Sequence, residues 1–230
     1  MKILSKNNIA FWFITFITIE LAPSMANAQT FEQTMVKAIC SCIEKDADLL
    51  TSMETPCLDE VTKANYQQLI KRYEMEHLPD SAYVLVPMLS PMIFFDLTVP
   101  LIETCDSFFV FIAKIRTTYW GELEAKHNEE YGQELKNQLE ETENAELLLE
   151  SGFWHLSNNN IEMAEALAQR IMDLEKARYL DKALELQGAI NEYQKAYSAA
   201  ASLYEEAFLE SGEERLEVLS ALMRRMDKND

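Results

Sequence analysis

The chain has 230 residues, of which 48% are hydrophobic, so it is long enough for one large domain or two small ones with a real core. Twenty basic and 39 acidic residues give a formal net charge of −19 at pH 7, and such a surface repels nucleic acid and anionic lipid. Only five glycines occur and no segment alternates strictly between polar and apolar residues, which indicates an all-α protein.

The first 28 residues have the parts of a secretory signal in the usual order. Two lysines provide a basic start, an apolar run covers residues 9–19, and Ala26-Asn27-Ala28 has the small–x–small pattern of a cleavage site. A membrane anchor is the alternative, but the run is shorter than the roughly 20 residues of a spanning helix. We therefore expect cleavage after Ala28 and a periplasmic or secreted protein without stable membrane insertion.

Two helices are expected next. Apolar residues at helical spacing predict a first helix over residues 30–50 and a second helix over residues 56–78. Thr55-Pro56 supports the second start, because threonine is a good cap and proline is favoured at the first helical position. Leu78-Pro79-Asp80 is expected to end this helix.

The four cysteines all lie in the N-terminal part of the chain. Disulfides persist where exported proteins mature, and an even number of cysteines suits two bridges. Cys40 and Cys42 point in different directions on a helix, so they take different partners. Two connectivities are open, Cys42–Cys57 with Cys40–Cys105, or Cys40–Cys57 with Cys42–Cys105. A zinc site and a redox-active Cys-x-Cys pair are the alternatives, but paired zinc-ligand spacing and a thioredoxin-like strand pattern are missing.

Residues 82–115 are strongly apolar, but prolines and acidic residues interrupt them, which disfavours a membrane span. We expect two or three short buried helices here, one of them starting at Ser90-Pro91. The phenylalanines of this segment are expected in the core, and a pocket for a small apolar ligand or lipid is the alternative. They are Phe94, Phe95, Phe108, Phe109 and Phe111.

The segment from Gly121 to Glu146 is rich in glutamate and has few large apolar residues. Those few fall near helical spacing, which predicts an exposed helix that joins two parts of the chain, with a flexible linker as the alternative. The predicted organisation is a cysteine-containing helical domain over residues 29–120, an acidic helical linker over 121–144 and a repeat region over 145–230.

Two stretches near the C-terminus repeat each other with an offset of 36 residues. Because the same register holds at several positions, we expect one helix–turn–helix unit to be used twice, over residues 145–178 and 181–212. Asn158-Asn159-Asn160 and the stretch from Glu192 to Lys195 are the expected turns. A last helix with Leu216, Leu219, Met223 and Met226 on one face is the expected cap. The matched pairs are Leu148 with Leu184, Gly152 with Gly188, Ile161 with Tyr197 and Ala164 with Ala200.

These units resemble the tetratricopeptide repeat, a 34-residue helix pair with large and small residues at fixed positions. The resemblance covers about 70 of the 230 residues. The departures are the 36-residue period, the missing proline near the end of each unit, and two units instead of about three. His155 and Asn191 stand where the family has tyrosine. The second unit matches with Leu184, Gly188, Tyr197, Ala200, Tyr204 and Ala207, and the first with Leu148, Gly152, Ile161 and Ala164, whereas its Ala168 and Ile171 differ.

The resemblance implies a groove along the inner face of the first helix of each unit. Family members that grip a C-terminal carboxylate have asparagine where Phe153 and Ala189 stand here, so the implied partner is an apolar, basic or amphipathic helix or peptide. The implied function is that of a protein- or peptide-binding scaffold or adaptor. The implied groove residues are Leu149, Phe153, Leu156, Glu185, Ala189, Glu192 and Tyr193.

A ferritin-like di-metal oxidoreductase is the alternative function, because the Glu-x-x-His motif of that class occurs twice on predicted helices. The chain is so rich in glutamate that this motif is weakly specific. No glycine-rich phosphate loop and no nucleophile context occurs either. The sequence therefore predicts a binding protein without catalytic residues, metal or cofactor. The motif residues are Glu74, His77, Glu124 and His127, with Glu44 and Glu103 as further ligands.

Overall fold

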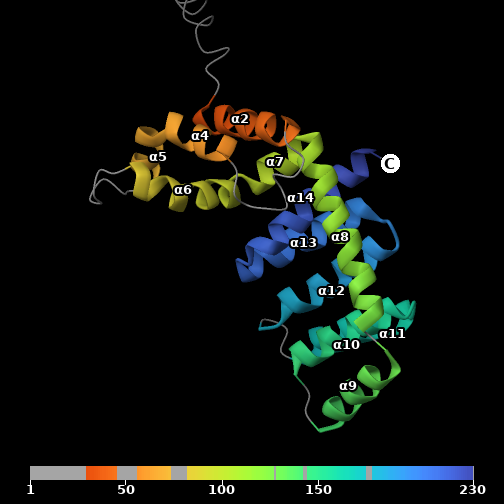
Figure 1. Ribbon diagram of the computed structural model, residues 1–230. Coiled ribbons are helices and arrows are strands. Elements are labelled where there is room, and N and C mark those ends of the chain that lie inside the picture. The colour runs from red at the N-terminus through yellow and green to blue at the C-terminus, as the bar shows by residue number, and fades with distance from the viewer. Residues whose placement is uncertain are drawn as a thin grey trace, which may run out of the picture. The chain divides into compact units, whose positions relative to one another are not determined.

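The computed structural model describes residues 30–45, 56–73, 82–126, 128–141, 144–174 and 178–229. Every regular element within these ranges is an α-helix, as the all-α prediction requires (Figure 1). The chain divides into two compact units, residues 1–35 and 36–230. The predicted signal segment and its cleavage site lie outside the described residues. Among the helices that the structure describes, none combines the length and the apolar character needed to cross a bilayer.

In the first unit, the described part is residues 30–35, where helix α2 (Phe31–Lys45) begins. Thr30 Oγ1 accepts a hydrogen bond from the Gln33 backbone N–H at 3.2 Å. The Gln33 side chain in return accepts from the Thr30 N–H at 3.1 Å. This reciprocal pair is a capping box, and it satisfies two donors that the first turn of a helix otherwise leaves free.

The second unit begins inside α2, and its described residues before Cys105 form four further helices. The helix predicted over residues 56–78 is broken into two, because the Asn65 side chain donates to the Val61 carbonyl at 2.8 Å where the first piece ends. Its expected end at Leu78-Pro79-Asp80 lies outside the described residues. The helices are α4 (Pro56–Ala64), α5 (Tyr66–Arg72), α6 (Ala82–Asp96) and α7 (Thr98–Thr104).

Two disulfides join these helices, and they follow the first of the two connectivities that the sequence left open. Cys42 is bonded to Cys57, with 5.7 Å between the Cα atoms, which ties α2 to α4. Cys40 is bonded to Cys105, with 5.6 Å between the Cα atoms, which ties α2 to the junction after α7. Both separations are normal for a disulfide.

The predicted helix start at Ser90-Pro91 is wrong, because α6 continues through both residues to Asp96. Ser90 does not cap a helix. Its buried hydroxyl lies 3.0 Å from the Val86 carbonyl, from Asp59 Oδ1 and from Thr62 Oγ1. This polar contact with α4 holds the segment in place although proline removes a backbone donor from the helix interior.

The phenylalanines of residues 82–115 divide between core and surface. Phe108 is buried and meets Phe94 edge to face, with 5.4 Å between the ring centroids. Phe109 packs against the C-terminal core, and Phe111 is half-buried. The core prediction is wrong for Phe95, which is 61% exposed. Apolar residues lie on all sides of α6, and only part of a helix surface can face one core.

A long helix leads from the cysteine-containing part to the repeats. It is α8 (Asp106–Lys126), and α9 (Glu129–Glu141) follows it. The predicted boundary at residue 120 falls inside α8. The boundary at residue 144 coincides with the cap of the next helix, where Asn144 Oδ1 accepts from the Leu147 N–H at 2.9 Å. The division into domains stays a prediction, since residues 36–230 form one unit.

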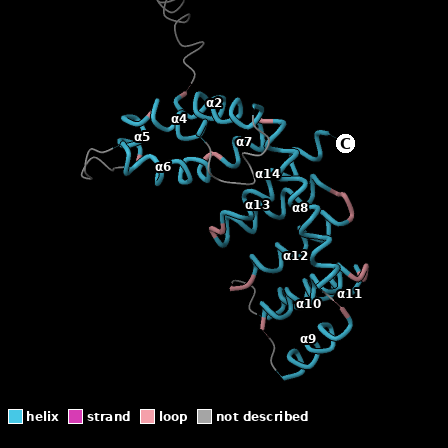
Figure 2. The backbone as a smooth tube through the Cα atoms, in the orientation of Figure 1, coloured by secondary structure: helices cyan, strands magenta, loops and turns pink. Residues whose placement is uncertain are grey.

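Two helical hairpins and a last helix make up the C-terminal part, in which each helix contacts the next (Figure 2). The first hairpin is α10 (Ala145–Ser157) and α11 (Ile161–Leu174). The second is α12 (Leu180–Tyr193) and α13 (Tyr197–Ser211). The last helix, α14 (Glu214–Asn229), packs on α13.

The turns inside the two hairpins have the same geometry at an offset of 36 residues. Asn159 and Lys195 both take a left-handed conformation, with φ of 57° and 60°. The next residue donates its N–H to a carbonyl five positions earlier, at 2.8 Å in both turns. This is the Schellman helix end. The predicted first turn is therefore confirmed, whereas the second lies later than expected, because Glu192 still belongs to α12.

Small residues let the hairpin helices approach closely. A Cβ atom on Gly152 would clash with the Leu186 side chain, and one on Gly188 would lie 2.9 Å from the Tyr204 ring. The core of the first hairpin extends to α12, and the core of the second extends to α14. Side chains of α8 pack against both cores, with Trp120 on the first and Phe109, Ile112 and Ala113 on the second.

Candidate functional site

The seven predicted groove residues differ in their exposure to solvent. Leu149, Leu156 and Ala189 are buried in the core between the hairpins. Two more are buried although charged, and these are Glu185 and Glu192, at 4% and 7% exposure. The remaining two, Phe153 and Tyr193, are half-buried and 38% exposed respectively.

Helix α8 of the same chain lies against α10 (Figure 1). The Trp120 ring centroid lies 6.2 Å from that of Phe153 on α10 and 6.0 Å from that of Tyr193 on α12. One helical turn before Trp120, Arg116 bonds to Glu192. The structure thus brings Phe153, Glu192 and Tyr193 together around α8, whereas Glu185 pairs elsewhere.

Glu192 accepts four hydrogen bonds, two on each carboxylate oxygen. Oε1 accepts from Arg116 Nε and from Trp120 Nε1, both at 2.8 Å. Oε2 accepts from the second guanidinium nitrogen of Arg116 at 2.8 Å and from the Tyr204 hydroxyl at 2.7 Å. A planar guanidinium matches a carboxylate in this two-bond manner, so the geometry selects arginine over lysine.

Burial explains why this network must be complete. Removing a carboxylate from water is costly, and a pair compensates for this only if nearly all its hydrogen-bonding positions are filled. Burial raises the pKa of Tyr204, and the neighbouring Glu192 raises it further. Burial alone would lower the pKa of Arg116, but the hydrogen bonds that Arg116 donates to Glu192, together with the attraction of the Glu192 charge, outweigh burial and raise the pKa. Arg116 therefore stays charged and Tyr204 stays neutral at any physiological pH.

Glu185 forms a second, more exposed pair with the last helix. Arg215 on α14 donates to both of its oxygens, at 2.5 and 2.7 Å. Glu213 also accepts from Arg215 and from Lys182, at 2.8 and 3.0 Å. The Arg215 side chain is 50% exposed, against 15% for Arg116, so solvent screens this pair more strongly.

Four aromatic rings from three helices meet at the surface above the Arg116–Glu192 pair. We call Tyr119, Trp120, Phe153 and Tyr193 the aromatic cluster. Trp120 lies at its centre, within 6.2 Å of each other ring. The Arg116 guanidinium lies 4.8 Å from the Tyr119 ring centroid and 5.0 Å from that of Trp120. These cation–π contacts fix the rings of Tyr119 and Trp120 in place. Tyr119 and Tyr193 nevertheless stay 38% exposed.

The alternative di-metal site falls only in part on the described residues. Glu74, His77 and His127 lie outside them, and Glu103 is 3.7 Å from Arg224 in an ion pair. Within the described ranges, no three His, Cys, Asp or Glu side chains are grouped closely enough to hold a metal ion.

Sequence reasoning missed the two residues of α8 that organise this site, Arg116 and Trp120. Their signal was indirect. By the 36-residue offset, Glu185 and Glu192 stand at the predicted groove positions where the first unit carries Leu149 and Leu156. A carboxylate at a buried position needs a cationic partner, and Arg116 is an arginine inside a largely apolar helix.

Compared with protein-family models, with curated proteins and with solved structures, the chain matches none of them.

Proposed function

We propose that the chain is an exported, tetratricopeptide-like scaffold that binds a protein or peptide through the aromatic cluster. The repeated hairpins supply a firm support, because the same turn occurs twice with the same hydrogen bonds. The export signal and the two disulfides are consistent with each other, since disulfides persist outside the cytoplasm. Because α8 lies over the floor of the predicted groove, a partner would bind at the edge of the groove.

The exposed part of the aromatic cluster carries this proposal. Tyrosine, tryptophan and arginine dominate the binding energy of protein interfaces, because they offer a large rigid area together with a polar edge. Here Tyr119 and Tyr193 are both 38% exposed and lie beside the buried ion pair of Arg116 and Glu192. Ordering them costs a partner little, since Trp120 already contacts both rings.

The expected partner is a basic, amphipathic helix or peptide. The chain has a net charge of −19, so long-range attraction favours a cationic partner and speeds its approach. Apolar side chains of the partner would contact the tyrosine rings, and its basic side chains would face the surrounding carboxylates. Association should therefore weaken as the salt concentration rises.

The test uses the chain from Gln29 onward, with a partner that co-purifies with it and is then purified alone. Changing Tyr119 and Tyr193 together to alanine should weaken binding at least tenfold in calorimetry, as expected for two interface aromatics. Leu209→Ala is the control, because Leu209 is 75% exposed on α13 and outside the aromatic cluster. An unchanged affinity in the double variant, or an equal loss in the control, would refute the proposed surface.

A metal assay separates this proposal from the oxidoreductase alternative. Iron, manganese or zinc at near-stoichiometric amounts in the purified chain would favour a di-metal bundle. A variant with His77 and His127 changed to alanine should then lose that metal. Under our proposal, the wild-type chain contains none at that level.

A further inference from the structure

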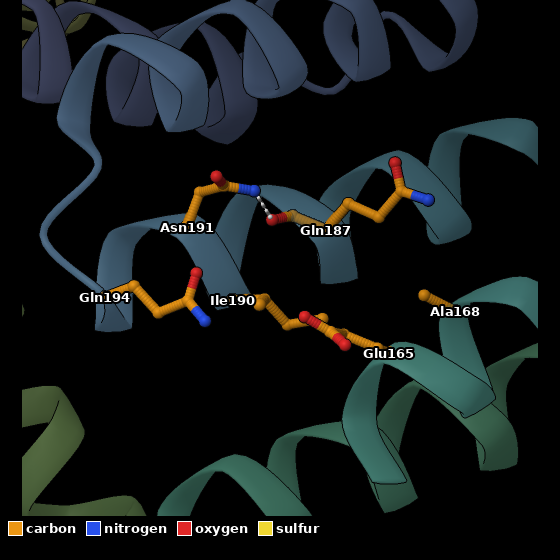
Figure 3. A pocket seen from close by; sticks show the side chains of 6 residues that line it. All are labelled: Glu165, Ala168, Gln187, Ile190, Asn191 and Gln194. Atoms are coloured by element: carbon orange, nitrogen blue, oxygen red, sulfur yellow. Dashed lines mark hydrogen bonds between the residues drawn. The ribbon is translucent and has the colours of Figure 1, made fainter. Parts of the chain in front are cut away.

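We propose a second binding site, a pocket between α11 and α12 that receives an aromatic side chain with a hydrogen-bond donor on its edge, such as tryptophan. The pocket has a volume of about 280 Å³ and is open to solvent. The aromatic cluster is not part of it, so the two proposals are independent. Six residues line the pocket, namely Glu165, Ala168, Gln187, Ile190, Asn191 and Gln194 (Figure 3).

The argument starts from the equivalent place one unit earlier, between α9 and α10. All six lining residues have a counterpart exactly one repeat offset before them in the chain. There the counterpart of Ile190 is Trp154 and the counterpart of Ala168 is Gly132. Trp154 fills the space, and its ring lies so close to Gly132 that any side chain at that position would clash. The counterparts are Glu129, Gly132, Ser151, Trp154, His155 and Asn158.

The chain itself therefore fills this space with an indole between α9 and α10 and leaves the equivalent space open between α11 and α12. Ile190 is smaller than tryptophan and is 3% exposed, so it forms the floor together with Ala168. An apolar cavity of about 150 Å³ in another protein is large enough for benzene. The pocket is open to solvent, and its volume of about 280 Å³ leaves room for an indole that rests on the floor with one edge in water.

The walls of the pocket offer acceptors for the edge of such a ring. The Asn191 amide nitrogen donates to the Gln187 backbone carbonyl at 2.8 Å, which leaves the Asn191 side-chain oxygen for a ligand (Figure 3). Glu165 and Gln194 add a carboxylate and a side-chain amide to the wall. In the filled interface, the Trp154 indole N–H likewise donates to an oxygen, the Asn128 carbonyl, at 3.1 Å.

This combination favours an aromatic ring over an aliphatic or anionic ligand. An aliphatic side chain would leave the amide and carboxylate groups of the wall without partners, which is costly when it also displaces their water. An anion would be repelled by Glu165. A ring with an N–H or O–H group matches both the apolar floor and the accepting wall.

The experiment is a titration of the chain with N-acetyl-tryptophanamide, followed by backbone amide chemical shifts in NMR. N-acetyl-alaninamide is the matched probe without a ring. The expected result is a set of saturable shifts at Ala168 and residues 187–194 with the first probe alone. No shift at these residues with about 10 mM probe would overturn the site, and so would equal shifts with the alanine probe.

Two variants test whether the pocket itself binds. Ala168→Gly with Ile190→Trp reproduces the Gly132–Trp154 pair, so the chain's own ring should fill the space and the shifts should disappear. Asn191→Leu keeps the helix but removes the acceptor and occupies the pocket, and it should weaken binding at least tenfold if the first variant fails to fold. Leu209→Ala is the control and should bind like wild type. Undiminished binding by a folded pocket variant would overturn the proposal.

Discussion

The two hairpins have the same turns but different side chains at the predicted groove positions. In the first hairpin, these positions carry Leu149, Phe153 and Leu156. The second hairpin carries Glu185, Ala189 and Glu192 at the equivalent positions. Both glutamates are buried and each is held by an arginine from a helix outside the hairpin. Two hairpins with the same turn can therefore differ in the contact at equivalent positions, which is apolar in the first and ionic in the second.

The difference also decides where α8 is fixed. Apolar contacts tolerate small shifts of a helix, whereas a guanidinium that meets a carboxylate with two parallel bonds allows one position. Arg116 and Trp120 both bond to Glu192, so the second hairpin sets the position of α8 along its axis. The first hairpin adds packing through Phe153. The aromatic cluster depends on both contributions.

The most damaging change should be the loss of the Glu192 carboxylate. Glu192→Ala leaves the Arg116 charge, the Trp120 N–H and the Tyr204 hydroxyl buried without an acceptor. We expect the free energy of unfolding to fall by about 3–5 kcal/mol. Denaturant unfolding followed by circular dichroism measures this. A loss below about 1 kcal/mol would contradict the buried network.

A matched variant separates the network from simple packing. Glu192→Leu combined with Arg116→Met and Tyr204→Phe gives the second hairpin the leucine of the first. It removes the guanidinium and the hydroxyl that would otherwise lose their acceptor, and it leaves the Trp120 N–H unpaired. Replacing a buried ion pair by apolar groups of similar size is often neutral. This triple variant should therefore be more stable than Glu192→Ala. The opposite order would mean that volume, not charge, makes Glu192 important.

Glycines test the close packing of both hairpins with an internal control. Gly152→Ala and Gly188→Ala should each lower the free energy of unfolding by about 1–3 kcal/mol, because the new Cβ atoms overlap Leu186 and Tyr204. Gly121→Ala in α8 should instead raise it by about 0.5–1 kcal/mol, since nothing lies within 4 Å and alanine favours a helix. Thermal unfolding of the three variants measures the expected decrease in stability of the first two and the expected increase of the third.

Local features of the fold could be predicted from the sequence. Helical periodicity and the 36-residue offset depend on neighbouring positions, and they correctly place the helices of both hairpins and the turn at Asn159. The disulfide partners were limited to two sets by the directions of Cys40 and Cys42 on one helix, and the structure has one of these sets.

Long-range contacts could not be predicted in the same way. Periodicity identifies a face that is covered, but it does not identify what covers it. Arg116 and Glu192 are 76 positions apart, and no local rule pairs them. The helix start at Ser90-Pro91 failed for a related reason, because a contact between Ser90 and α4 overrides the local preference of proline. Exposed Phe95 shows that an apolar segment alone does not define its buried side.

The smallest expected effect concerns pH and compares His155 with its counterpart, Asn191. His155 Nδ1 is buried and has no hydrogen-bond partner within the described residues. Burial lowers the pKa of His155 below its ordinary value near 6.5. The unfolded chain then binds this proton more readily than the folded chain does, so stability falls as the pH drops from above 6.5 through the lowered pKa.

His155→Asn should therefore reduce the loss of stability between pH 7.5 and pH 5. Asparagine copies Asn191, which sits in the second hairpin without a titrating group and bonds to a backbone carbonyl. The measurement is the free energy of unfolding of both chains at each pH. Carboxylates and the remaining histidines contribute equally to the two chains, so the difference between their slopes isolates position 155. Equal slopes would mean that the His155 ring is solvated in the folded chain, and that the first hairpin is less tightly packed there than its buried neighbours indicate.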